Sequence, residues 1–186
     1  MVEHLQPPDP GSDVVIVEHD ASWPAAYARQ EERIRAALGD LDIEVHHAGS
    51  TSVPGLAAKP VIDVVLVLPD ARDEAAYAGA LQGAGYVFVH REPEWYEHRM
   101  FKDRSRLPRI NLHVFPAGCE EVDRMLLFRD HLRTHDADRA TYERTKRELA
   151  TRSWATAQDY ANAKSEVVAE IMARALADPI PPEGVS

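Results

Sequence analysis

Short apolar or alternating runs recur through the first two thirds of the chain and predict β-strands. These strands are expected near residues 42–48, 61–68, 86–90, 97–102 and 109–115. Apolar residues at helical spacing predict a first helix over Trp23–Leu38 and a second over 71–82. The first part of the chain therefore reads as a mixed α/β layer.

After Phe115 the pattern changes to helical spacing throughout. Helices are expected at 119–135, 138–151 and 156–177. Because no strong linker separates the two halves, we predict one domain over 14–177, of the α/β (α+β) class. Its C-terminal helices are expected to pack across the sheet and to close one side of a cleft.

Both ends of the chain are rich in proline and carry no regular apolar pattern. Residues 1–13 and 178–186 are therefore predicted to be flexible tails, and no function is placed there.

The charge balance narrows the partners, since the 186 residues carry a formal net charge of -10. Such a charge opposes approach to nucleic acid in general and to an anionic membrane surface. An anionic ligand would need a local basic pocket. With one cysteine, no run of the roughly 20 apolar residues that span a membrane and no signal-peptide pattern, a soluble cytoplasmic protein is expected.

Asp63 interrupts the wholly apolar strand at 61–68. Val61, Val65 and Val67 are expected on the same face of that strand. Desolvating an ionised carboxylate is costly unless a specific group pairs with it. Asp63 is therefore either a hydrogen-bonded core carboxylate or a functional acid.

A glycine-serine turn precedes this strand. Gly49 permits a tight turn, and Ser50 and Thr51 offer hydroxyl and amide groups that suit a phosphate oxygen. Lys59, between the turn and the strand, is a further phosphate-binding candidate. An ordinary turn without a ligand is the competing interpretation.

The strand at 109–115 carries polar residues on one face, among them Asn111 and His113. If this face adjoins Asp63, a carboxylate and an imidazole would lie together and could hold a metal, a proton or a phosphate. The alternative is the solvent-facing side of an antiparallel sheet.

Cations replace apolar residues on the inner faces of the C-terminal helices. They are Arg129, Arg133, Lys146 and Lys164, and Arg99 on a strand is a further candidate. Each alone is compatible with a snorkelling side chain. Because three helices share the pattern, we predict a polar cleft whose cations complement phosphates and a carboxylate.

Four segments together resemble the GrpB family. They are HHAGSTSVPGLAAKPVIDVVLVL at 46–68, LHVF at 112–115, LLFRDHLRTH at 126–135 and TYERTKRELA at 141–150. The resemblance spans residues 14–176, and its most specific part is the GSTSVPGL, AKP and ID series. The same domain occurs fused to some bacterial dephospho-CoA kinases.

That family is assigned to the nucleotidyltransferase superfold shared with DNA polymerase beta, which implies a mixed sheet with flanking helices. Through the resemblance, Gly49 and Ser50 would contact nucleotide phosphates, and Asp63 would be the first metal-binding carboxylate, for Mg²⁺ or Mn²⁺. The second would lie two residues later on the same face, where this chain has Val65.

Two functions follow as alternatives. In the first, a nucleotidyltransferase-like enzyme uses Asp63 as a metal ligand and His113 as a ligand or base. In the second, the fold persists as a non-catalytic domain that binds a nucleotide or another phosphorylated small molecule, with a link to coenzyme A metabolism suggested by the fusion. The valine at position 65 favours the second, since two-metal transfer needs several carboxylates.

Overall fold

A six-stranded mixed sheet organises the computed structural model, which describes residues 1–7, 14–105 and 107–177. The strand order is β1-β4-β5-β6-β3-β2. The strands are β1 (Glu3–His4), β2 (Glu44–Ala48), β3 (Val61–Leu68), β4 (Val87–Glu92), β5 (His98–Asp103) and β6 (Arg109–Pro116). Strands β3 and β6 run parallel, while the other neighbouring pairs are antiparallel. The predicted mixed sheet is confirmed.

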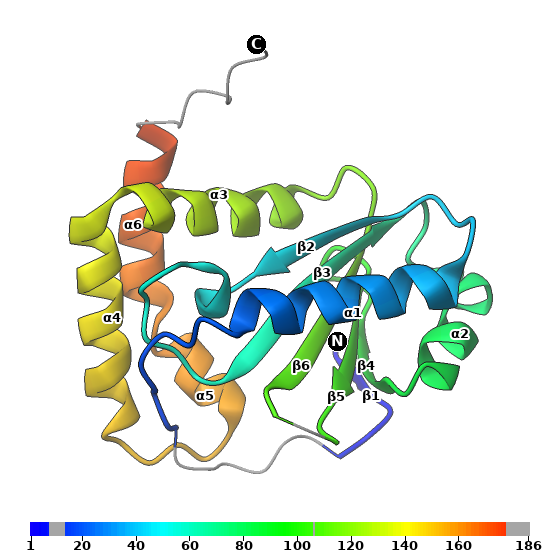
Figure 1. Cartoon of the computed structure of the whole chain (residues 1–186), viewed down its shortest axis with the longest axis horizontal. Helices are drawn as coiled ribbons and strands as arrows, with labels where there is room; N and C mark the ends of the chain where they lie inside the picture. The colour runs from blue at the N-terminus through cyan, green and yellow to red at the C-terminus, as the bar shows by residue number, and fades with distance from the viewer. Residues whose placement is uncertain (8–13, 106, 178–186) are drawn as a thin grey trace.

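Helices cover both faces of the sheet (Figure 1). They are α1 (Trp23–Leu38), α2 (Ala78–Gly83), α3 (Glu120–Thr134), α4 (Asp136–Ala150), α5 (Ala157–Asn162) and α6 (Ser165–Ala177). Helix α1 lies along the sheet, and α3 to α6 gather on the side away from α2. The predicted flanking helices and C-terminal helical portion are thus confirmed.

Alternation along β3 divides the core between the two faces. Ile62, Val64 and Leu66 pack into the main apolar cluster with α1 and α2. On the other face Val65 and Val67 pack beneath α3. The end of that second face nearest Asp63 is not covered by α3 and lines a cleft.

Two predicted helices are each broken in the structure. The segment 71–82 forms a short 3-10 turn at Glu74–Ala76 and then α2, because Tyr77 between them is buried and donates its hydroxyl to the carbonyl of Ala71 at 2.6 Å. The segment 156–177 breaks between α5 and α6, beside Lys164. This break changes the direction of the chain where it faces the cleft.

The N-terminal prediction needs one correction. Residues 1–13 were expected to be a flexible tail, but Glu3–His4 form β1 and pair with Arg91 and His90 of β4. This strand forms because β4, at the edge of the sheet, offers free backbone hydrogen-bonding groups, and the local sequence of residues 3–4 gives no sign of it. The remainder of the predicted tails, 8–13 and 178–186, lies outside the described residues.

Within residues 1–7, 14–105 and 107–177, none of the helices has the length and apolar character needed to cross a membrane.

Candidate functional site

The glycine-serine turn and Asp63 meet in van der Waals contact. Strand β2 ends at Ala48, Gly49 takes a φ of +67°, and a 3-10 turn follows over Ser50–Ser52. A methyl group on Gly49 would overlap the Oδ2 atom of Asp63. Glycine is needed here both for its left-handed backbone and because the carboxylate occupies the space of a side chain.

Asp63 has partners on the neighbouring parallel strand. The Nδ2 atom of Asn111 donates to Oδ1 of Asp63 at 2.8 Å, and Nε2 of His113 lies 3.8 Å from the same oxygen. The Asp63 side chain keeps 27% of its exposure, so its carboxylate opens into the cleft. Burial opposes ionisation, but the interactions with His113 and Asn111 prevail and hold the pKa of Asp63 below its usual value.

The turn itself is fixed from within the sheet. The Thr51 hydroxyl donates to the carbonyl of Val61 at 3.1 Å and lies 3.1 Å from Nε2 of His47. Burial lowers the pKa of His47 to about 4, so the ring is neutral and donates its Nε2 proton to Thr51. The His47 ring stacks on Tyr27 with 4.7 Å between centroids. Thr51 thus holds the turn as well as facing the cleft.

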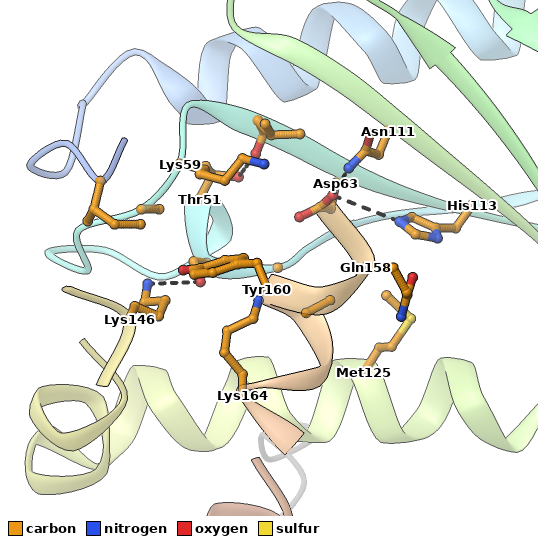
Figure 2. Close-up of a pocket in the computed structure, with 16 residues that line it drawn as sticks. Thr51, Lys59, Asp63, Asn111, His113, Met125, Lys146, Gln158, Tyr160 and Lys164 are labelled. Carbon is orange, nitrogen blue, oxygen red and sulfur yellow. Dashed lines mark hydrogen bonds and ion pairs between the residues drawn. The ribbon is translucent and has the colours of Figure 1, made fainter. Parts of the chain in front are cut away.

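A cleft of about 380 Å³ opens beside this turn (Figure 2). Its lining includes Gly49, Ser50, Thr51, Lys59, Asp63, Asn111, His113, Lys146, Gln158, Tyr160 and Lys164. The sheet contributes the acid and the imidazole, and α4, α5 and the loop after α5 contribute the opposite wall. Among the lining residues that the structure describes, Asp63 is the one carboxylate and the lysines number three.

Lys146 is the most deeply placed of these cations. Its Nζ atom donates to Oγ of Ser50 at 3.1 Å and to the carbonyl of Ala57, and it lies 4.8 Å from the centre of the Tyr142 ring. Burial, and then repulsion from Lys164, lower the pKa of Lys146 to about 7. A nearby anion would favour its protonated form.

Lys164 projects into the cleft from the break between α5 and α6, with its Nζ atom 4.8 Å from the centre of the Tyr160 ring (Figure 2). Tyr160 and Gln158 belong to the lining but were not among the sequence candidates. Tyr160 had the apolar spacing of a core residue, and only the broken helix turns it toward the cleft. Asn111 was placed on the polar face by alternation, but its bond to Asp63 depends on the parallel register.

Two of the predicted phosphate-binding cations, Arg129 and Arg133, lie outside the main cleft and hold the glycine-serine turn. Arg129 forms an ion pair with Asp130 at 2.7 Å and donates to the carbonyl of His47 at 3.1 Å. Arg133 donates to the carbonyl of Ser52 at 2.9 Å and also pairs with Asp130. Arg129 also lines a smaller cavity of about 120 Å³ next to Ser50.

Arg99 is not brought to the cleft. It follows the opposite alternation of β5, and its guanidinium pairs with Glu74 at 2.8 Å and with Glu97 at 3.2 Å. Arg99 was expected to reach the cleft because its side chain is long. It lies on the opposite face of the sheet, where Glu74 and Glu97 hold its guanidinium.

Position 65 shows why a second strand carboxylate is absent. Val65 lies two residues from Asp63 on the same face, but it is fully buried beneath α3 with Phe115 and Val122. The cleft ends before this position. The donor set therefore does not fit a two-metal centre, which requires carboxylates for both ions.

The same donor set fits one hard cation. Mg²⁺ is commonly held by one or two carboxylates together with the phosphates of a substrate, and it retains several waters. Asp63 would supply the carboxylate. His113 beside it is a candidate further ligand, and its imidazole suits Zn, Fe or Ni ions better than Mg²⁺ or Mn²⁺.

Comparison with known proteins places this architecture in one family. The model of the GrpB protein family matches residues 13–174. The chain belongs to the GrpB family. A UPF0157 protein of Halalkalibacterium halodurans, BH1888, is 49% identical over 164 residues, which cover 88% of this chain and 83% of that protein.

A solved structure of the same family has the fold of this chain. The crystal structure of GrpB from Enterococcus faecalis has a TM-score of 0.71 and 23% identity, covering 88% of this chain and 98% of that one. Cid1 poly(U) polymerase bound to MgATP has a TM-score of 0.44 and 14% identity, covering 71% and 45% of the two chains. That likeness is too distant to bear on activity.

A dephospho-CoA kinase of Mycolicibacterium paratuberculosis is also similar, with 26% identity over 164 residues. The match covers 75% of this chain and 40% of the kinase, in keeping with the fusion expected from the sequence.

Replacing Gly49 by alanine is expected to displace the Asp63 carboxylate. Gly55→Ala is the matched control, because Gly55 also has a positive φ, +77°, but its added methyl would meet open space. Both variants place a methyl group on a backbone with positive φ, and each is expected to lose about 1–3 kcal/mol for that reason. Gly49→Ala should lose a further ~1–3 kcal/mol in urea denaturation because of the overlap. Equal losses in the two variants would contradict the contact.

An aspartate at position 65 is expected to destabilise the protein. Val65→Asp puts a carboxylate into an apolar cluster, and we expect a loss of about 4 kcal/mol or more in the free energy of unfolding. Val61→Asp, on the same face but partly exposed at the cleft, is the control and should lose much less. A well-tolerated Val65→Asp would show that the position can hold a second acid.

The amine of Lys146 is expected to titrate near neutral pH. A ¹³C NMR titration of its Cε resonance, assigned with Lys146→Met, should give a midpoint near 7. Since the lysine gains its charge as the pH falls through 7, anion binding in the cleft should strengthen between about pH 8 and pH 6. A midpoint near the ordinary 10.5 would show that the carbonyl and hydroxyl partners offset the burial.

Proposed function

We propose that the cleft binds a phosphorylated small molecule, a nucleotide or a phosphorylated metabolite, together with one Mg²⁺ or Mn²⁺ ion. The observation that carries this proposal is the placement of Lys59, Lys146 and Lys164 around a single carboxylate, Asp63, in one cleft. In a chain with a net charge of -10, this local excess of cations suits an anion.

The arrangement distributes its roles between the two walls. Lys146 and Lys164 act as point charges for phosphate oxygens, and the Ser50 hydroxyl beside Lys146 adds a hydrogen-bond donor. Tyr160 gives an aromatic surface on the same wall. The turn is held rigid by Thr51, so it needs little rearrangement to receive a ligand.

Asp63 is the proposed metal ligand on the opposite wall. A bound divalent ion would neutralise phosphate charge and polarise the phosphoryl group. Asn111 holds the carboxylate in place through the bond to Oδ1 and leaves Oδ2 turned toward Gly49 and the cleft. The position of the acid is therefore set before a ligand arrives.

Single-metal nucleotidyl transfer is the second candidate function. It is favoured by His113, whose Nε2 atom faces Asp63 within the same cleft and would act as a metal ligand or a base. Coenzyme A precursors belong among the ligands to test, because the similar kinase from M. paratuberculosis is named for dephospho-CoA. Binding without turnover is placed first, since the second strand acid is replaced by the buried Val65.

Calorimetry with ATP, UTP and dephospho-CoA, with and without Mg²⁺ or Mn²⁺, tests the proposal. We expect at least one ligand to bind to the wild type in a metal-dependent manner. Asp63→Asn should remove the metal dependence, and Lys164→Ala should weaken binding by about 10-fold or more, as for loss of a charged hydrogen bond. Arg35→Ala is the control, because it removes a cation from α1, where Arg35 pairs with Glu31.

The outcomes separate the alternatives. Binding that ignores metal and Asp63 but falls in Lys164→Ala would retain the anion site and exclude the metal. Release of pyrophosphate by the wild type, lost in Asp63→Asn, would establish nucleotidyl transfer. If the wild type binds none of the three ligands, with or without metal, the proposed function is wrong.

A further inference from the structure

A second group of metal-ligating side chains lies on the same face of the sheet as Asp63, on strands β5 and β4, which are two and three strands away from β3. His90 and Glu92 project together from β4, and Glu92 pairs in register with His98 of β5. Their ligand atoms all lie within 4.8 Å of one another. Among the residues that the structure describes, it is the one cluster of three or more His, Cys, Asp or Glu side chains with this geometry.

The contacts within the group converge on one carboxylate oxygen. Oε2 of Glu92 lies 2.7 Å from Nδ1 of His98 and 3.5 Å from Nε2 of His90. A zinc ion with bonds of about 2.0–2.2 Å requires its ligand atoms to be about 3.3 Å apart. The Glu92–His90 distance of 3.5 Å is close to this value, and the Glu92–His98 distance of 2.7 Å must open slightly. Two imidazoles and one carboxylate are a typical ligand set for zinc and similar ions.

The surroundings support a preformed site. His98 is 1% exposed and is held between Trp95 and Phe115, with ring centroids 5.1 and 4.7 Å away. His90 and Glu92 keep 18% and 24% of their side-chain exposure, which leaves a path for an ion.

We propose that His90, Glu92 and His98 bind one late first-row divalent cation such as Zn²⁺, with water completing its coordination. This site is separate from the Mg²⁺ or Mn²⁺ position at Asp63, and it uses nitrogen ligands that a hard ion does not prefer.

His98 would connect the two sites. Its Nε2 atom lies 3.1 Å from Nδ1 of His113, whose Nε2 atom in turn faces Asp63 at 3.8 Å. A metal on Nδ1 of neutral His98 leaves the ring proton on Nε2, which then donates to His113. The proton of His113 is thereby placed on its Nε2 atom, facing Asp63.

The contacts from His98 through His113 to Asp63 would let zinc affect metal binding in the cleft, an effect that rests on the proposed function. With zinc bound at His98, His113 presents a donor to Asp63 instead of a lone pair to a metal. Without zinc, Nδ1 of His98 can keep its proton, facing Glu92 at 2.7 Å, and Nε2 of His113 is then available to a metal at Asp63. Zinc bound at His90, Glu92 and His98, here called the outer site, would then weaken metal binding at Asp63 in the cleft.

Titration of the full-length chain with Zn²⁺, followed by calorimetry, and with Co²⁺, followed by visible absorption, tests the site. The wild type should bind a single equivalent. His90→Gln and Glu92→Gln should each weaken Zn²⁺ binding by more than about 100-fold, beyond the effect of losing an outer-sphere partner. Both side chains are partly exposed, so the variants should fold, which circular dichroism will establish.

Two controls identify the location. His46→Gln removes a histidine that pairs with Glu44 at 3.1 Å but belongs to no three-residue cluster of the described residues, and it should leave Zn²⁺ affinity unchanged. Asp63→Asn should still bind one equivalent of Zn²⁺, even where it abolishes ligand binding in the cleft. In ¹⁵N NMR spectra, Zn²⁺ should fix the proton of the neutral His113 ring on Nε2.

Failure of the zinc site is distinguishable from failure of the cleft. The proposal is overturned if the wild type binds neither Zn²⁺ nor Co²⁺, or if both outer-site variants bind as tightly as the wild type. Loss of Zn²⁺ binding in Asp63→Asn would place the ion in the cleft and also overturn it. None of these results depends on whether a phosphorylated ligand binds.

Discussion

The close approach of Asp63 to Gly49 is the constraint on which the candidate site depends. A carboxylate can occupy this place only because position 49 carries no side chain and because Asn111 on the parallel strand donates to it. The contact fixes the turn against the sheet. Lys146, Arg129 and Arg133 of the helices then donate hydrogen bonds to the turn and to the end of β2 before it. One acid thereby links the α/β half to the helical half.

The cations of the helical half serve two purposes that sequence alone does not separate. Arg129 and Arg133 use their planar guanidinium groups to donate to backbone carbonyls of the turn region and to share Asp130. Lys146 and Lys164 present compact ammonium groups to the cleft. The division follows the chemistry of the two residue types, since arginine suits fixed multidentate contacts and lysine acts as a point charge.

Periodicity predicted the sheet, α1 and most of the helical half, because these elements are governed by local alternation and helical spacing. Alternation also grouped Asp63 with Val65 and Asn111 with His113. What it missed depends on distant partners: β1 forms because the edge of β4 accepts it, and Arg99 faces away from the cleft. The cluster around His98 was missed because its residues come from two strands and have no regular spacing.

The parallel pairing of β3 with β6 has a consequence for how the site is acquired during folding. Asp63 and Asn111 are 48 positions apart, and the β4–β5 hairpin lies between their strands in sequence. Local elements such as α1 and that hairpin can form before this long loop closes, whereas the acid and its amide partner meet only afterwards. We therefore expect the cleft to be completed late in folding, when the sheet has closed.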